Sequence, residues 1–212
     1  ALLMATARRV TETEHWLRAG HWKKFSICDT PLAMDIHHSN LGIMGMGRIG
    51  QAIAKRASGF SMNVMYHNRS RLSPDLEQEC GARYVDRDTL LKESDHIILV
   101  MPYTPENHHL FGEKELSLMK PTATLINIAR GGIVDELALA KALKEKRIFA
   151  AGIDVFEGEP TVRPELLALS NVVLSPHIAS ATEKTRRAMI ELAIENCLAG
   201  LAGKTPPNLL KA

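Results

Sequence analysis

Three side chains suited to acid–base chemistry and to carboxylate binding follow successive apolar runs in the second half of the chain. Arg130 stands in "INIARGGIVDE", Glu159 in "GIDVFEGEP" and His177 in "LSPHIASAT". An arginine can hold a carboxylate through two parallel hydrogen bonds, and a histidine kept protonated by a carboxylate can act as a general acid. The set suits reduction of a 2-oxo acid: Arg130 binds the carboxylate and polarises the carbonyl, and the Glu159–His177 pair supplies the proton.

Each of these residues also has an ordinary structural interpretation. His177 taken alone is more often a hydrogen-bonded structural histidine, and Arg130 can complete an ion pair at a helix end. Glu159 can be an exposed acid in a turn. The prediction of a site therefore rests on the three residues following successive strands, since open α/β sheets bind ligands at the carboxyl ends of their strands.

A glycine-rich loop has the spacing of a dinucleotide-binding site. "LGIMGMGRIGQAIAKRA" places Gly45, Gly47 and Gly50 in the pattern G-x-G-x-x-G, after an apolar run and at the start of an amphipathic segment. The first glycine permits a tight turn, the second lets the backbone approach a pyrophosphate, and the third lets helix and strand pack closely. Such triplets also occur in simple turns and in methyltransferases, so the strand–turn–helix context carries the prediction.

The stretch "YHNRSR" at 66–71 bears on which nucleotide the loop suits. NAD sites place an acid at about this point, where it binds the ribose 2′-hydroxyl and repels a 2′-phosphate. Here Asn68 stands in that place, and Arg69 and Arg71, with the Ser70 hydroxyl, offer charge-assisted hydrogen bonds to a phosphate. We predict an NADP site, with NAD as the alternative if the arginines form only a solvated basic turn.

Short apolar runs alternate with amphipathic segments from residue 40 onward. The runs cover 41–45, 62–66, 82–85, 96–101, 124–128, 150–155 and 171–175. Several of the segments between them begin with an Asp or Ser suited to capping a helix. This alternation predicts an α/β fold, a doubly wound parallel sheet of the Rossmann type whose strands are buried on both faces.

Helices are also expected at both ends of the chain. The apolar residues of 1–20 recur on one face and predict a single helix. Ser180 and Glu183 predict a capping box at the start of a last helix. The expected regions are an N-terminal helix and dimerisation arm over 1–36, a dinucleotide-binding domain over 37–180, and a C-terminal helix and tail over 181–212.

The composition is that of an ordinary globular protein. The chain has 212 residues, is 45% hydrophobic and 24% charged, and carries a formal net charge of +2. This near balance gives no electrostatic reason to expect nucleic acid or an acidic membrane surface as a partner, and no apolar run is long enough to span a bilayer. Three widely spaced cysteines (Cys28, Cys80 and Cys197) favour a reducing, cytoplasmic location over a disulfide framework.

The histidines predict no metal site. Apart from His177, the histidines at 15, 21, 37, 38, 67, 96, 108 and 109 do not form a zinc pattern. His37–His38 and His108–His109 are adjacent pairs, which point apart on a strand or a helix, so we expect them to be surface or loop residues.

Five stretches resemble the D-isomer-specific 2-hydroxyacid dehydrogenase family. They are "LGIMGMGRIGQAIA", "MPYTPENHHLF", "LMKPTATLINIARGGIVDE", "AAGIDVFEGEP" and "LSPHIASATEKTR", in order and at family-like spacing. Within the family the chain is most similar to the glyoxylate/hydroxypyruvate reductase and 2-ketogluconate reductase branch, whose members often prefer NADPH. The resemblance implies a cytoplasmic homodimer, joined through the nucleotide domain and the arm, that reduces a small 2-oxo acid to the D-2-hydroxy acid.

The resemblance also implies roles for individual residues. It makes Arg130, Glu159 and His177 the substrate-binding and proton-relay triad, and Arg69 a ligand of the 2′-phosphate. The other residues that it places against the cofactor are Arg48 and Ile49 at the pyrophosphate, and Met101, Pro102, Ile128, Ala129 and Asp154 around the nicotinamide half. Asn107 is counted among the cofactor-binding residues, although a threonine is common at its position.

Family chains begin with a separate substrate domain, which nothing before Ala1 provides. We therefore expect this chain to represent the nucleotide-binding domain, able to bind NADPH and catalytically incomplete by itself. An alternative from another class is an NAD(H)-sensing protein like the C-terminal binding protein corepressors, which share the fold and the triad. Formate or phosphite dehydrogenase would change the substrate, but formate dehydrogenases of the family carry Gln where Glu159 stands.

Overall fold

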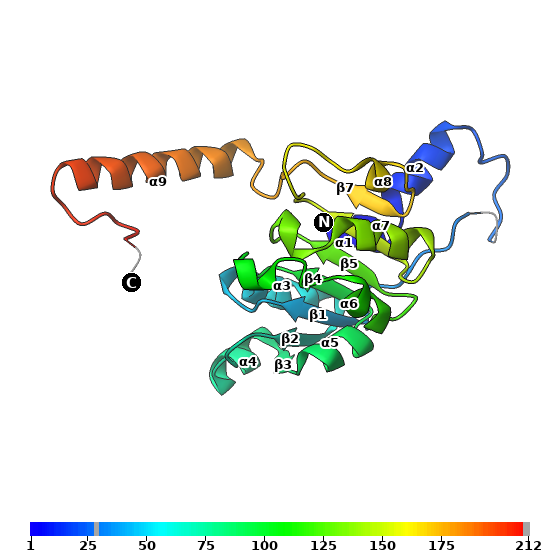
Figure 1. The fold of residues 1–212 in the computed structure, drawn as a ribbon, viewed down its shortest axis with the longest axis horizontal. Coiled ribbons are helices and arrows are strands. Elements are labelled where there is room, and N and C mark those ends of the chain that lie inside the picture. The colour runs from blue at the N-terminus through cyan, green and yellow to red at the C-terminus, as the bar shows by residue number, and fades with distance from the viewer. Residues whose placement is uncertain (28–29, 210–212) are drawn as a thin grey trace. The chain divides into compact units, whose positions relative to one another are not determined.

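A seven-stranded parallel sheet forms the centre of the computed structural model, which describes residues 1–27 and 30–209 (Figure 1). The strands lie in the order β3-β2-β1-β4-β5-β6-β7. Their bounds are β1 Asn40–Met44, β2 Asn63–His67, β3 Ala82–Tyr84, β4 His96–Leu99, β5 Thr124–Asn127, β6 Ala150–Ile153 and β7 Val172–Leu174. Each predicted apolar run holds one strand, so the predicted parallel sheet is confirmed.

Helices connect successive strands, and local capping fixes where several of them begin. The connecting helices are α3 Arg48–Ala57, α4 Pro74–Cys80, α5 Arg87–Glu93, α6 Glu113–Leu118, α7 Glu136–Lys144 and α8 Pro164–Leu167. The side chains of Ser73, Asp86 and Asp135 accept hydrogen bonds from backbone N–H groups in the first turns of α4, α5 and α7. These caps satisfy amide groups that a helix cannot pair internally. The predicted Asp and Ser capping positions are confirmed there.

Both faces of the sheet are covered, as a fully parallel sheet requires. Strand residues alternate between two hydrophobic clusters: Ile43 packs on one side with Ala54 of α3, and Met44 packs on the other with Leu90 of α5. The first cluster also receives Leu2 from the N-terminal helix, and the second receives α6 and α7. The strands are consequently apolar throughout rather than alternating.

The strand order reverses between β1 and β4. β1 pairs with β2 on one side and β4 on the other, and the register sets Met44 against His67 and against Leu99. The chain therefore leaves all three strands at the same edge of the sheet. Connections that diverge from two neighbouring parallel strands leave a crevice at their carboxyl ends, where open α/β folds bind ligands.

The N-terminal region contains two helices rather than the single helix predicted over residues 1–20. α1 (Leu2–Ala7) and α2 (Val10–Arg18) are separated by Arg8 and Arg9, and the φ of 53° at Arg9 is left-handed. The reason is tertiary packing: α1 contacts β5, β6 and β7, and Ala7 is fully buried. The Arg9 side chain then binds Glu12 and the carbonyl oxygen of Leu32, which stabilises the break.

The chain divides into two compact units, 1–176 and 177–212. The second unit holds α9 (Glu183–Leu201), whose N-cap is Thr182: its hydroxyl oxygen accepts a hydrogen bond from the N–H of Thr185 at 3.2 Å. The predicted capping box at Ser180 is therefore wrong by two residues. No helix within the described ranges is both long and apolar enough to cross a membrane.

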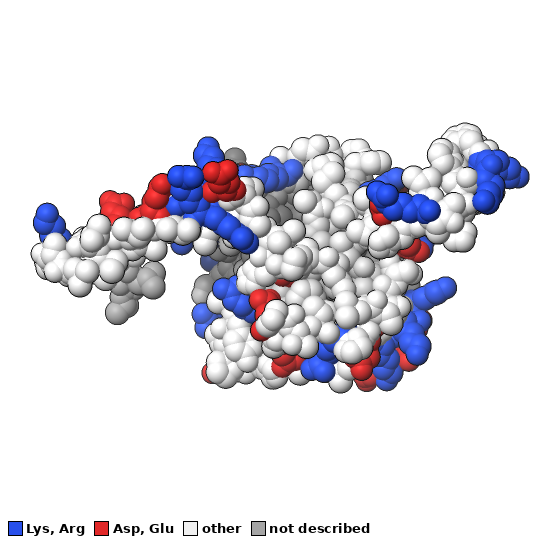
Figure 2. Space-filling model, turned by 90° about the horizontal axis from the view of Figure 1, so that it is seen from above, with Lys and Arg blue, Asp and Glu red and all other residues white. Residues whose placement is uncertain are grey.

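Charged groups of both signs are distributed over the surface. Figure 2 shows Lys and Arg interspersed with Asp and Glu at the margins of one face of the first unit, and few charges in its middle. Of the three cysteines, Cys28 lies outside the described residues, while Cys80 is buried and Cys197 is exposed, both as free thiols.

Replacing Gly152 by alanine should weaken the docking of α1 on β6. A Cβ atom at this position would lie 2.4 Å from the hydroxyl oxygen of Thr6 and 2.8 Å from Leu2 Cγ. Overpacking of this kind costs about 1–3 kcal/mol, which urea denaturation would measure as a lower midpoint. Gly59→Ala is the matched control, because a Cβ there meets no atom within 4 Å. Equal midpoints for the two variants would contradict the packing argument.

Candidate active site

The three glycines of the G-x-G-x-x-G loop have distinct surroundings. Gly45 has a φ of +104°, and a Cβ there would lie 2.8 Å from the backbone nitrogen of Met101. A Cβ on Gly50 would lie 2.3 Å from the carbonyl oxygen of Gly45, so α3 can approach β1 only with glycine at 50. Gly47 precedes the first turn of α3, and a Cβ there would meet no atom within 4 Å. The geometry thus matches a turn glycine, a packing glycine and a glycine that faces open space.

A cavity of about 730 Å³ lies at the crevice between β1 and β4. The loops that follow β1, β2 and β4 form its walls. The predicted cofactor residues that line it are Gly45, Gly47, Asn68, Arg69, Ser70, Met101, Pro102 and Asn107. Sequence reasoning missed Arg87, Thr104 and Glu106, which also line it. The cavity begins at a helix N-terminus and extends across the point where the strand order reverses, the switch point of the sheet. Such a cavity suits an extended anionic ligand such as a dinucleotide.

Asn68 holds the second loop against the first. Its side-chain oxygen accepts a hydrogen bond from the backbone N–H of Met46 at 2.8 Å. The position where NAD sites often carry an acid is therefore neutral and engaged with the glycine loop. Arg69 and Ser70 follow it, exposed and on the cavity wall.

Arg71 has a different environment from Arg69. Its guanidinium donates two hydrogen bonds to the Glu77 carboxylate, at 2.8 and 2.7 Å. Glu77 Oε1 also accepts a 2.7 Å hydrogen bond from the buried hydroxyl of Tyr66. The same hydroxyl accepts from the N–H of Leu72 at 2.8 Å. The network pairs Arg71 with a carboxylate and fixes the turn that presents Arg69 and Ser70.

Asn107 stabilises the loop after β4. Its side-chain oxygen accepts from the N–H of Thr104, and its side-chain nitrogen donates to the carbonyl oxygen of Pro102, both at 2.8 Å. Both ends of the amide are therefore engaged with the loop backbone. Asn107 shapes the cavity wall by holding Pro102 and Thr104 in place.

A second cavity, of about 640 Å³, surrounds Arg130. The predicted residues that line it are Ile49, Met101, Pro102, Ile128, Ala129 and Arg130, and those that sequence reasoning missed include Tyr103, His108 and Glu157. A third cavity, on the exposed side of α3, is lined by Gly47, Arg48 and Ile49. Tyr103 and His108 lie within "MPYTPENHHLF", and Glu157 lies within "GIDVFEGEP". The motifs that carry the family resemblance therefore contain all three residues.

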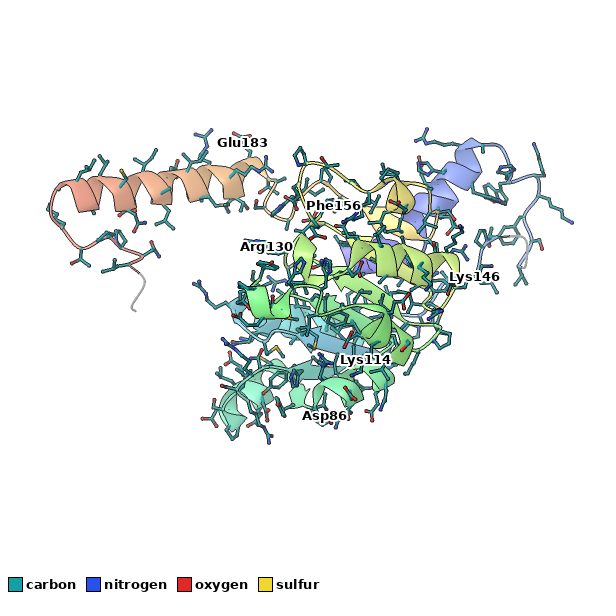
Figure 3. The ribbon with its side chains drawn as sticks, in the orientation of Figure 1. Asp86, Lys114, Arg130, Lys146, Phe156 and Glu183 are labelled. Atoms are coloured by element: carbon teal, nitrogen blue, oxygen red, sulfur yellow. The ribbon has the colours of Figure 1, made fainter. Side chains whose placement is uncertain are left out.

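The backbone around Arg130 is held by Asn127 and by a close contact between loops. The Asn127 side chain accepts from the N–H of Ala129 and donates to the carbonyl oxygen of Arg130, both at 3.0 Å. A Cβ on Gly131 would lie 1.9 Å from the carbonyl carbon of Phe156, so the loops after β5 and β6 are in direct contact. Arg130 and Phe156 are labelled in Figure 3, and both line the second cavity. The Arg130 guanidinium is exposed, with Nη1 2.7 Å from the carbonyl oxygen of Ala129.

The loop after β6 carries two of the predicted acids. Asp154 is 4% exposed, and its Oδ1 accepts a 2.5 Å hydrogen bond from the Ser175 hydroxyl. Glu159 Oε1 accepts from the backbone N–H of Phe156 at 2.9 Å. Arg130 and Glu159 thus stand on contacting loops of the first unit. His177 is the first residue of the second unit, so its role in a triad stays a prediction.

The adjacent histidines His108 and His109 lie in the loop after β4, as expected, but their rings do not point apart. The His108 and His109 rings stack with centroids 3.9 Å apart and planes 22° apart. The reason is that the pair lies in a loop, where His109 has a left-handed φ of 52°, and neither strand nor helix geometry applies. The His37 and His38 rings also lie near each other, edge to face at 5.3 Å.

Comparison with known proteins identifies the family. Residues 1–179 match the family model for the D-isomer specific 2-hydroxyacid dehydrogenase, NAD binding domain. The chain belongs to this family. It is 53% identical to a glyoxylate reductase of Thermococcus litoralis, over 99% of this chain and 64% of that protein. It is 49% identical to a glyoxylate/hydroxypyruvate reductase B of Enterobacter agglomerans, over 98% of this chain and 64% of that protein.

Solved structures agree with this assignment. The fold matches an NADPH-dependent glyoxylate/hydroxypyruvate reductase from Sinorhizobium meliloti, solved with NADP and malonate, with a TM-score of 0.84 and 37% identity. That match covers 94% of this chain and 61% of the other. A protein from Thermus thermophilus gives a TM-score of 0.89 at 44% identity, over 98% of this chain and 64% of that one. The chain thus spans less than two thirds of these relatives, and its family is the one that the sequence motifs predict.

Replacing Glu77 by glutamine should destabilise the chain at neutral pH, with a smaller effect in acid. Hydrogen bonds from Arg71 and Tyr66 lower the pKa of the Glu77 carboxyl from 4.5 to about 2. A carboxyl whose pKa is lowered by folding stabilises the protein above the unfolded-state pKa, and this contribution is lost as the pH falls through the folded-state pKa. The difference in unfolding midpoint between variant and parent should shrink as the pH falls from about 4.5 toward 2.

Glu79→Gln on the same helix provides the control. Glu79 pairs with Lys55 at the surface, where both side chains are about half exposed, so its loss should cost little. A pH-independent difference for Glu77→Gln would show that the Tyr66–Glu77–Arg71 network does not hold the turn through charge.

Proposed function

We propose that this chain is the cofactor-binding part of a reductase that uses NADPH in preference to NADH. The reaction is reduction of a small 2-oxo acid, such as glyoxylate, hydroxypyruvate or 2-ketogluconate, to the D-2-hydroxy acid. The observation that carries the proposal is the cavity at the switch point, which runs from the open face of Gly47 to Arg69 and Ser70. The family assignment and the reductase names of the relatives support it.

The preference for NADPH rests on the charges at one end of the cavity. Asn68 replaces an acid with a neutral amide, so no carboxylate at that position repels a 2′-phosphate. Arg69 supplies a positive charge beside it. The pKa of the Glu106 carboxyl is lowered mainly by a hydrogen bond from Thr104, and the Arg69 charge adds to this effect. Arg87, the other arginine on the wall, pairs with Glu115 at 2.9 Å, which leaves Arg69 as the better-placed phosphate ligand.

The cofactor, when bound, supplies the hydride that the substrate carbonyl carbon accepts. Arg130 binds the substrate carboxylate through its exposed guanidinium and polarises the carbonyl oxygen. His177 gives the proton that this oxygen takes up, and Glu159 orients the imidazole for that transfer. The Asn127 hydrogen bonds and the Gly131–Phe156 contact fix the Arg130 backbone while this happens.

A homodimer is part of the proposal. No residue of α2 is buried within the described chain, and its Val10 and Leu17 are each about half exposed, as is Trp22 in the segment that follows. A helix with large apolar side chains in contact with solvent suits burial against a second copy.

Replacing Arg69 by alanine should separate the two cofactors. A charge-assisted hydrogen bond contributes about 1.5–3 kcal/mol, so NADPH binding should weaken roughly tenfold or more while NADH binding hardly changes. Fluorescence titration of the chain with each nucleotide measures both constants. Arg83→Ala is the control, since Arg83 is exposed on β3 and lies 3.6 Å from Glu93. Equal weakening of NADPH and NADH would refute the phosphate role.

Replacing His177 by alanine should remove turnover and spare cofactor binding. A suitable host is a chimera in which this chain replaces the matching 64% of the Thermococcus litoralis enzyme. Loss of a general acid lowers kcat by about 10²–10⁴-fold, while the NADPH dissociation constant should stay the same. Glyoxylate-dependent oxidation of NADPH by the variant and the unmutated chimera gives the comparison. A variant that keeps full turnover would exclude His177 as the proton donor.

A further inference from the structure

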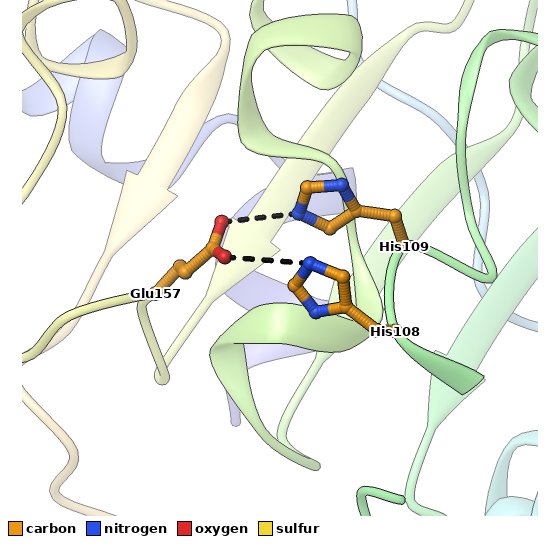
Figure 4. A group of neighbouring side chains, drawn as sticks. All are labelled: His108, His109 and Glu157. Atoms are coloured by element: carbon orange, nitrogen blue, oxygen red, sulfur yellow. Dashed lines mark hydrogen bonds and ion pairs between the residues drawn. The ribbon is translucent and has the colours of Figure 1, made fainter. Parts of the chain in front are cut away.

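His108, His109 and Glu157 meet at the edge of the cavity that contains Arg130. Figure 4 shows both imidazoles facing the same carboxylate: His109 Nε2 lies 3.1 Å from Glu157 Oε2, and His108 Nε2 lies 3.7 Å from Oε1. One nitrogen from each ring and one carboxylate oxygen all lie within 4.8 Å of one another. His108 and Glu157 also line the cavity itself.

The surrounding backbone is shaped to hold the two rings together. The left-handed conformation of His109 sets its ring beside that of His108, and its N–H donates to the carbonyl oxygen of Gly132 at 2.8 Å. A Cβ on Gly132 would lie 3.1 Å from His108 Nδ1 and 3.0 Å from Tyr103 Cε2. Glycine at 132 therefore leaves the space that these two side chains occupy. A non-glycine residue held at positive φ costs energy, so the arrangement must be supported by its neighbours.

The second ring nitrogen of His108 has a partner of its own. The Tyr103 hydroxyl lies 3.2 Å from His108 Nδ1. Histidines that bind metals nearly always engage their other nitrogen in a hydrogen bond, which fixes the tautomer and leaves the first nitrogen as the ligand. The Tyr103 hydroxyl can accept a hydrogen bond from Nδ1–H, which leaves His108 Nε2 facing Glu157 as the ligand atom.

Charged groups besides the two histidines lie near Glu157. Arg163 also approaches, with Nη2 3.6 Å from Glu157 Oε2, and would oppose a cation. Its Nε, however, lies 3.4 Å from Oε2 of the buried Glu136, whose other oxygen accepts from the N–H of Glu157. Glu136 thus places a second carboxyl group against the Arg163 guanidinium.

We propose that His108, His109 and Glu157 bind one divalent transition metal ion of the Zn²⁺ class. Two imidazoles and a carboxylate are a ligand set for borderline ions, whereas Mg²⁺ and Ca²⁺ prefer oxygen ligands throughout. Zn²⁺ sits at about 2.0–2.2 Å from such ligands, so binding draws the three groups together. Three protein ligands leave one tetrahedral position for water or for an oxygen of a small acid in the adjoining cavity.

The test is direct metal binding by the chain after treatment with a chelator. Calorimetric titration with Zn²⁺ should give one site per chain, and Co²⁺ should bind there with the visible absorption of a tetrahedral nitrogen–oxygen site. Glu157→Gln and His109→Gln should each weaken Zn²⁺ binding by at least about tenfold. Tyr103→Phe, which leaves all three ligands in place, should weaken it by about 10- to 100-fold through loss of the imidazole partner. Circular dichroism checks that each variant is folded, and His108→Gln replaces any that is not.

The chain offers a matched control in its other adjacent histidine pair. His37 and His38 lie near Asp35, with His37 Nε2 3.8 Å from Asp35 Oδ1, but their rings are edge to face. A His37→Gln/His38→Gln variant should bind Zn²⁺ like the parent, as should Cys197→Ser. The proposal is overturned if the parent binds neither ion, or if folded His108→Gln and His109→Gln variants bind Zn²⁺ as the parent does. The test needs no nucleotide, so it stands apart from the proposed reductase function.

Discussion

The close approach of α3 to the end of β1 is the constraint on which the rest of the site depends. Gly50 permits it, because any larger residue would overlap the carbonyl oxygen of Gly45. With α3 this close, the first turn of the helix points its unpaired amides into the crevice between β1 and β4. The loops after β2 and β4 then close the cavity around that helix end. The turn, the helix and the strand order therefore form the site together. Each of the three glycines meets a different steric requirement of it.

The parallel sheet could be predicted from sequence because its strands are apolar on both faces. Seven short apolar runs separated by capped amphipathic segments allow few other folds, and Ser73, Asp86 and Asp135 cap as local chemistry predicts. The cavity residues were predictable for the same reason: motifs at strand ends gather at one edge of a parallel sheet. Asn68, Arg69 and Ser70 reach the wall by this route.

The features that could not be predicted depend on contacts distant in sequence or on loop geometry. The break at Arg9 follows from docking α1 on β5–β7, which no periodicity in residues 1–20 reveals. Arg71 looked equivalent to Arg69, but the buried Tyr66 hydroxyl and Arg71 meet at Glu77. His108 and His109 face one acid because a left-handed residue in a loop follows neither strand nor helix periodicity. In each case a contact distant in sequence or a loop conformation overrode a local rule.

The contact between Gly131 and Phe156 has a mechanical consequence. Two loops with no room for a methyl group between them move as one body, because sliding either would require overlap or an empty gap. The loop that carries Arg130 and the loop that leads to Glu159 therefore form one rigid wall rather than two loops that move independently. A change in the width of a cleft on this wall would therefore require movement elsewhere in the protein.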